Sequence, residues 1–117
     1  MHTTGVPLDV DVRSLTGSVT GWVLTISGEI DTSSAPTLHD KVSELLAGKD
    51  EDGMLLVMDL SRVEFVDSSG LRVIVAVANE MERRGGRLEL DGLSAAARRI
   101  LELTGLIDRY RSTSDHD

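Results

Sequence analysis

Runs of alternating apolar and polar residues open the chain and predict two strands. Residues 8–13 and residues 22–27 both alternate, which is the pattern of a strand with one buried face. The sequence Thr-Gly-Ser at 16–18 lies between the two runs and favours a turn, so we expect a hairpin. Residues 28–31 follow the second strand, and we expect them to leave the sheet.

Three later segments place apolar residues three or four positions apart, the spacing of an amphipathic helix. The first follows Ser34, a candidate N-cap, and ends near Gly48. The second runs to about Arg84 and ends at a pair of glycines. The third follows Ser94, which can cap it, and stops at Gly105.

Two further strands separate these helices. Residues 54–60 form a nearly continuous apolar run, which indicates a central strand covered on both faces, and residues 87–90 form a short alternating strand. The resulting order predicts one α/β domain with a mixed, mostly parallel sheet of about four to five strands and about three to four helices. We expect a core over about 8–110, with flexible ends at 1–7 and 111–117.

Composition and charge narrow the classes of partner and chemistry. A net charge of −8 argues against nucleic acid and anionic membranes, because both attract clustered Lys and Arg. No apolar run approaches the roughly 20 residues of a membrane span, and residues 1–7 lack the features of a signal peptide. The chain has no cysteine, and no His/Asp/Glu cluster has metal-ligand spacing. We therefore expect a cytoplasmic protein without a metal or cofactor.

Two polar turns fall where a strand ends and a helix begins. They have the sequences Asp-Thr-Ser-Ser at 31–34 and Asp-Ser-Ser-Gly at 67–70. Because the carboxyl ends of parallel strands meet at one edge of a sheet, these turns should lie side by side. The residues brought to this edge are Asp31, Asp67, Ser68 and Ser69.

A phosphate on Ser68 would suit the start of a helix, where backbone N–H groups are free to bind it. It would add about −1.5 to −2 charge and repel a partner fitted to the uncharged turn. The same residues also fit a purely structural role, with Asp67, Ser68 and Ser69 capping the helix and Gly70 easing its start.

An enzyme is a further alternative, with Ser68 or Ser69 as nucleophile and Asp31 or Asp67 as acid/base. Such a serine needs an activating base, but the three histidines fall in the two tails and in a helix. The chain also has no Gly-x-Ser-x-Gly motif. We therefore expect no enzymatic activity.

Three segments together resemble the STAS domain of bacterial anti-sigma-factor antagonists. They are Gly-Glu-Ile-Asp at 28–31, Phe-Val-Asp-Ser-Ser-Gly-Leu at 65–71 and the closing helix over 96–106. The resemblance covers about Leu8 to Tyr110. The first two motifs are specific as a pair, at this separation and at the ends of strands.

The resemblance implies a protein that binds an anti-sigma factor and so frees a sigma factor. In that family the anti-sigma factor is often a serine kinase, whose target here is Ser68, with Ser69 as runner-up. A phosphatase resets the switch, and Ser69 would cap the helix or support the turn. The implied partner-binding residues are Asp31, Asp67, Ser68, Ser69, Gly70 and Arg72.

The remaining expectations concern the oligomeric state and an alternative function. We expect the chain to be a monomer or a weak dimer. The alternative function is a STAS scaffold or interaction component of a larger signalling or transport complex, without control by phosphorylation.

Overall fold

The computed structural model describes residues 6–49 and 53–110 of the chain. Its strands are β1 (Asp9–Ser14), β2 (Gly21–Ile30), β3 (Leu55–Val66) and β4 (Arg87–Leu93). Its helices are α1 (Ala35–Leu46), α2 (Ser68–Arg83), α3 (Ala95–Thr104) and α4 (Ile107–Tyr110). Of the predicted flexible ends 1–7 and 111–117, residues 1–5 and 111–117 lie outside the described residues, as do residues 50–52 of the loop before β3. The Val6 carbonyl oxygen accepts a hydrogen bond from the Glu29 N–H at 3.1 Å.

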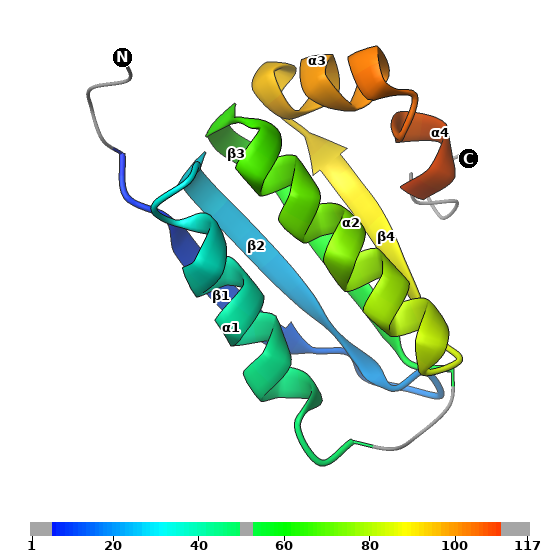
Figure 1. Cartoon of the computed structure of the whole chain (residues 1–117). Coiled ribbons are helices and arrows are strands. Elements are labelled where there is room, and N and C mark those ends of the chain that lie inside the picture. The colour runs from blue at the N-terminus through cyan, green and yellow to red at the C-terminus, as the bar shows by residue number, and fades with distance from the viewer. Residues whose placement is uncertain (1–5, 50–52, 111–117) are drawn as a thin grey trace.

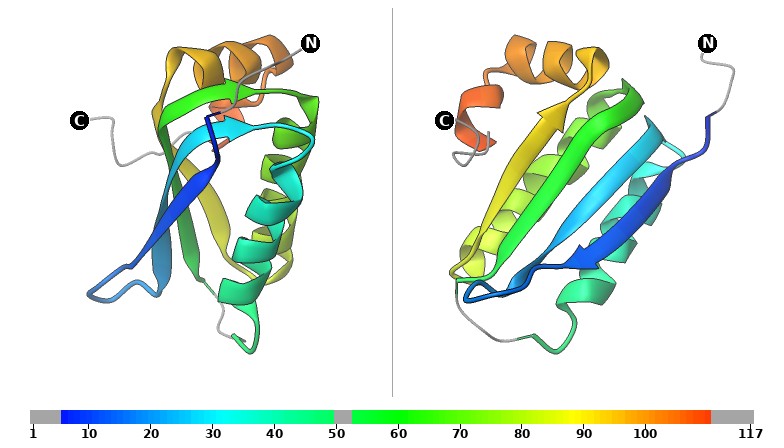
Figure 2. Two further views of the ribbon diagram at one scale, coloured as in Figure 1. Left: turned by 90° about the vertical axis from the view of Figure 1, so that its left-hand side faces the viewer. Right: turned by 180° about the vertical axis from the view of Figure 1, so that it is seen from behind.

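The four strands form one sheet in the order β1-β2-β3-β4. β1 is antiparallel to β2, whereas β2, β3 and β4 are parallel to one another. α1 and α2 lie side by side on one face of this sheet, and α3 lies at the end of the sheet where β4 ends (Figures 1 and 2). The prediction of a mixed, mostly parallel α/β fold is therefore confirmed.

The core fills the space between the sheet and the two helices, and it is almost entirely aliphatic. α1 and α2 each contribute one buried stripe at the helical spacing that the sequence predicts. Burying one Leu or Ile side chain contributes roughly 1.5–3 kcal/mol, so these stripes fix both helices on the sheet. Side chains with no exposed surface include Leu24, Ile26, Ile30, Leu38, Met54, Leu56, Met58, Leu60, Met81 and Leu101.

Only one face of β3 is fully covered, which corrects the prediction of a strand buried on both faces. Leu56 and Met58 are buried beneath the helices, but Val57 between them is only half-buried. Figure 2 shows that no helix crosses the opposite face of the sheet. The half-buried apolar residues Leu55 and Val57 on that face made the run look continuous in the sequence.

Both central strands are longer than the sequence patterns predict. β3 continues to Val66, and β2 remains in the sheet to Ile30 instead of leaving it after residue 27. β3 has one extra residue at each of two points where its register against β2 shifts. These extra residues interrupt the alternation of side chains, so the sequence pattern of the strand ends too early. At the first point the Asp59 carboxylate accepts hydrogen bonds from the Ser61 N–H at 2.9 Å and the Ser61 hydroxyl at 2.7 Å.

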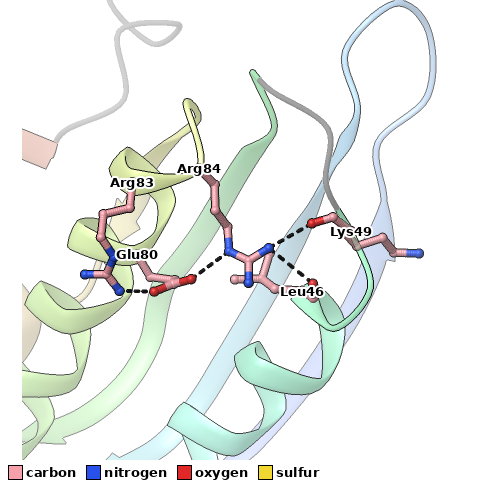
Figure 3. Close-up of polar contacts among 5 residues, drawn as sticks. All are labelled: Leu46, Lys49, Glu80, Arg83 and Arg84. Carbon is pink, nitrogen blue, oxygen red and sulfur yellow. Dashed lines mark hydrogen bonds and ion pairs between the residues drawn. The ribbon is translucent and has the colours of Figure 1, made fainter.

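Arg84, just after α2, connects the carboxyl-terminal ends of α1 and α2 (Figure 3). Its Nη1 donates to the carbonyl oxygens of Lys49 at 2.8 Å and Leu46 at 3.4 Å. Its Nε donates to Glu80 Oε2 at 2.7 Å, and Glu80 also pairs with Arg83. The hydrogen bond from Arg84 is the main cause that lowers the pKa of Glu80 from 4.5, and the contacts with Arg83 lower it further. Together they outweigh the effect of partial burial, which raises this pKa.

We expect Arg84→Ala to lower the free energy of unfolding by about 1 kcal/mol, because the carbonyls of Leu46 and Lys49 each lose one hydrogen bond and Glu80 loses a partner. Arg83→Ala is the matched control, since the Arg83 side chain is 68% exposed against 31% for Arg84. That control should change stability by less than about 0.5 kcal/mol. Urea denaturation of both variants at neutral pH checks this, and equal losses would contradict the connecting role of Arg84.

Candidate functional site

The two polar turns meet at the carboxyl ends of β2 and β3, as their positions predict. The Asp67 N–H donates to the carbonyl oxygen of Ile30 at 3.2 Å, which joins the end of β3 to the end of β2. The hydroxyls of Thr32 and Ser69 lie 3.2 Å apart and share a hydrogen bond between the turns. The site is therefore one surface formed by the first turns of α1 and α2.

Asp67 is the N-cap of α2 and is one of the three residues that the sequence offered for this role, whereas the resemblance expected Ser69 to cap the helix or support the turn. Its Oδ1 accepts hydrogen bonds from the backbone N–H groups of Ser69 at 2.9 Å and Gly70 at 3.1 Å. A carboxylate at this position is favoured by these donors and by the positive end of the helix dipole. Two of the N–H groups that were expected to be free for a phosphate are thus already occupied.

The two serines of this turn have different environments. Ser68 is the first residue of α2 and is exposed, and its hydroxyl forms no hydrogen bond within residues 6–49 and 53–110. Ser69 is half-buried and is engaged with Thr32. Of the two hydroxyls, only that of Ser68 is free to react without breaking a contact described in this turn.

Gly70 allows the first turn of α2 to pack directly against the end of β2. It is buried, and a Cβ atom at this position would lie 2.6 Å from the Ile30 carbonyl oxygen and 2.8 Å from Ile30 Cγ2. No side chain fits at those distances without a shift of the helix. Gly70 therefore acts on the site by setting the position of Asp67 and Ser68.

Asp31 organises the other turn. Its Oδ1 accepts from the N–H groups of Ser33 and Ser34, both at 3.0 Å, and from the Ser33 hydroxyl at 2.9 Å. These bonds, the Ser33 hydroxyl first, lower the pKa of Asp31 from its ordinary 3.8. Asp31 therefore holds the shape of the turn as a carboxylate.

Ser34 occupies the predicted N-cap position of α1 but does not cap the helix with its side chain. Its hydroxyl donates to the Glu29 carbonyl oxygen at 2.7 Å and accepts from the Asp31 N–H at 3.0 Å. Pro36, in the first turn of α1, has no N–H that needs a partner. Ser34 thus closes the turn onto β2, and the sequence alone could not separate this role from capping.

We expect Asp31→Ala to destabilise the chain at neutral pH and the loss to shrink in acid. Because the folded-state pKa of Asp31 lies below its unfolded value, its stabilisation is complete above about pH 4 and is lost as pH falls through the folded value. Denaturation of Asp31→Ala and the parent chain at pH 7 and pH 2.5 measures the difference. A constant difference at both pH values would contradict this role for the Asp31 carboxylate.

Arg72 is exposed on α2, one helical turn after Ser68. Its side chain lines a groove between α1 and α2 together with Thr32, His39, Asp40 and Ser69. Arg72 forms no ion pair or hydrogen bond with any other described residue. Its guanidinium is therefore available at the edge of the site.

Two absences hold for residues 6–49 and 53–110. Within them, no group of three His, Asp or Glu side chains could hold a metal ion. No helix in the same part of the chain has the length and apolar character that crossing a membrane requires.

Thr32 is the site residue that the sequence did not single out. Nothing in the local pattern marks it, because its contact with Ser69 joins residues 37 positions apart. The sequence did indicate that Asp67 could cap α2, because Asp is among the preferred N-cap residues.

Comparison with known proteins gives consistent results. A family model described as "Mlab, STAS domain" matches residues 9–108. The anti-sigma-B factor antagonist of Bacillus subtilis is 36% identical over 101 residues, which cover 86% of each chain. The anti-sigma-F factor antagonist RsfB of Mycobacterium tuberculosis is 33% identical over 96 residues, 81% of this chain and 75% of RsfB. The crystal structure of an anti-sigma factor antagonist from Mycobacterium paratuberculosis superposes on this chain with a TM-score of 0.74. The match covers 93% of this chain and 90% of that protein, and the two sequences are 30% identical.

Proposed function

The chain belongs to the STAS-domain family of anti-sigma-factor antagonists, and on that basis we propose that it binds an anti-sigma factor and so releases a sigma factor. The anti-sigma factor is a serine kinase that uses ATP, and its target is Ser68. Phosphorylation ends the interaction and a phosphatase restores it. The names of the relatives support the kind of partner, and the geometry of the α2 turn supports the choice of residue.

The observation that carries the proposal is the free hydroxyl of Ser68 in a turn whose other polar groups are engaged. Asp67 caps α2, Ser69 bonds to Thr32, and Asp31 holds the neighbouring turn. A partner therefore meets a surface of fixed shape with one reactive group on it. A kinase can modify that group while the hydrogen bonds that shape the turn stay in place.

Phosphorylation of Ser68 would change the charge of this surface more than its shape. The phosphate brings about −1.5 to −2 charge to a position next to the Asp67 carboxylate. A partner that packs closely on the neutral serine would have to bury this charge or move away from it. Loss of binding is the expected result.

The proposed contact surface consists of two kinds of residue. Asp31, Asp67 and Gly70 set its shape through contacts inside the chain. Ser68 and Arg72 are exposed and can touch the partner directly. Substitution of Ser68 or Arg72 should therefore affect partner binding more than stability.

Kinase reactions with ATP test this proposal, using the parent chain, Ser68→Ala and Ser69→Ala. The kinases are anti-sigma factors from the same host, and mass spectrometry maps the phosphate. We expect modification of the parent chain and of Ser69→Ala, but none of Ser68→Ala. Phosphate on Ser69, or equal modification of both variants, would overturn the assignment.

A second candidate function is an interaction component of a larger assembly without phosphorylation control. The observation in its favour is Leu103 on α3, which is 80% exposed and lies beside Arg99 and Glu102. Native mass spectrometry separates the two functions. We expect a cytoplasmic monomer or weak dimer, whereas a stable large assembly would favour the second candidate.

We propose no enzymatic activity for this chain. Ser68 has no hydrogen bond to a base within the described residues, and His39 lies in the middle of α1. Hydrolysis of a generic ester that is lost in Ser68→Ala would contradict this.

A further inference from the structure

A phosphate on Ser68 would find two of the backbone donors at the start of α2, the N–H groups of Ser69 and Gly70, already in use. The Ser69 and Gly70 N–H groups, which normally receive an anion at a helix N-terminus, both donate to the Asp67 carboxylate. To use them, the phosphate would have to displace the cap of its own helix. Because a backbone N–H group carries no full charge, a full counter-charge for the phosphate within the chain must come from a side chain.

The nearest elements present mainly acidic groups. Asp67 precedes Ser68 directly, Asp31 lies in the adjoining turn, and Asp40 faces the groove from α1. His39 faces the same groove, and Arg72 lies on the α2 side of it. The guanidinium of Arg72 is the group with a permanent positive charge here.

The position of Arg72 suits contact with a group on Ser68. Residues four positions apart lie on the same face of a helix, and helical side chains lean toward the N-terminus. The Arg72 side chain therefore reaches back over the turn that Ser68 begins. No other described residue engages its guanidinium.

We infer that Arg72 binds the phosphate of phosphorylated Ser68 and is its counter-charge within the chain. The guanidinium can donate two parallel hydrogen bonds to phosphate oxygens, which a lysine cannot do. This inference rests on the proposed phosphorylation of Ser68. It deepens that proposal by naming the residue that responds to the modification.

One consequence concerns the partner. In the unphosphorylated chain, Arg72 is exposed at the proposed contact surface and is available to an acidic group of the anti-sigma factor. In the phosphorylated chain, Arg72 turns to the phosphate. A single modification thus removes two groups, the Ser68 hydroxyl and the Arg72 guanidinium, from the surface that the partner recognises.

The test uses the full chain with phosphoserine installed at position 68 during translation, so that no kinase is needed. Phosphorus NMR follows the titration of the phosphate between pH 4 and pH 8 in the parent chain, Arg72→Gln and Arg72→Lys. An adjacent cation favours the dianion, so Arg72→Gln should move the midpoint up by about 0.5 pH, with Arg72→Lys in between. The difference in midpoint between Arg72→Gln and the parent chain should shrink at about 1 M salt, because the Debye length is then only about 3 Å.

Arg13→Gln is the matched control, because Arg13 is an exposed arginine in β1 that pairs with Val23, far along β2 from the site. It should move the midpoint by less than about 0.1 pH. Repeating the comparison in a His39→Gln background removes the other basic side chain that lines the groove. A midpoint for Arg72→Gln equal to that of Arg13→Gln would overturn the inference. The kinase assay is a separate measurement, so failure of the proposed function would leave this result standing.

Discussion

Replacing Ser68 with aspartate should weaken binding to the anti-sigma partner by about a hundredfold, which corresponds to about 3 kcal/mol. The new carboxylate enters a surface that already holds Asp67, at a position where the parent chain presents a small neutral hydroxyl. Stability should change little, because Ser68 is exposed and an acidic residue suits the first turn of a helix. Isothermal titration calorimetry with the anti-sigma factor identified by the kinase assay measures the affinity.

Two variants show whether this loss is specific to the turn. Ser68→Ala removes the hydroxyl without adding charge and should keep the affinity within a few-fold. Ser18→Asp adds the same charge in the turn between β1 and β2, at the opposite end of β2, and should have no effect beyond a few-fold. If Ser68→Asp and Ser18→Asp bind equally well, Ser68 does not lie at the interface.

Gly70→Ala should lower the free energy of unfolding by about 1–3 kcal/mol, which is the usual cost of overpacking. Helix propensity alone predicts the opposite, since Ala is favoured over Gly in a helix by about 1 kcal/mol. The contact decides the sign, because a Cβ at this position would meet the Ile30 carbonyl oxygen at 2.6 Å and backbone cannot rotate aside. Thermal or urea denaturation distinguishes the two effects directly.

Ala76→Gly is the converse control, at an exposed position of the same helix. It should cost about 1 kcal/mol through propensity alone. Gly70→Ala should also weaken partner binding, because α2 can relieve the clash only by moving its first turn, with Asp67 and Ser68, away from β2. A Gly70→Ala chain more stable than the parent would contradict the close packing of α2 on Ile30.

Most of the fold could be predicted from the sequence because its signals are local. Helical spacing and the glycines at positions 85 and 105 placed the helices, and the Ser94 hydroxyl caps α3 by accepting from the Ala97 N–H at 3.1 Å. The alternation of strands and helices led to the mostly parallel sheet. Each of these signals depends on neighbours within a few positions, where the sequence alone is informative.

The missed features depend on contacts between distant segments. The second half of β3 was not predicted because two extra residues change which side chains face the core, and Ser61 and Arg62 in succession look like a loop. The pairing of Glu29 with Phe65, near the end of both strands, becomes visible only once β2 and β3 are adjacent. Local patterns carry no information about such register shifts.

The meeting of the two turns was predicted, but not the hydrogen bonds within them. The sequence brought the 31–34 and 67–70 turns together, and the structure joins them through Thr32 and Ser69. It offered Asp67, Ser68 and Ser69 as caps without deciding among them, and the resemblance favoured Ser69, but Asp67 accepts from both N–H groups. Several short polar side chains near a helix start can all accept such bonds, and only the backbone geometry decides among them.

The most direct measurement of the central claim is the affinity of one purified anti-sigma factor for the chain with and without a phosphate on Ser68. Calorimetric titrations of the two forms, at the same salt and pH, give this comparison without relying on a mimic. We predict clear binding of the unphosphorylated chain and an affinity at least about a hundredfold lower for the phosphorylated one. Equal affinities for the two forms would contradict the account of Ser68 as the switch.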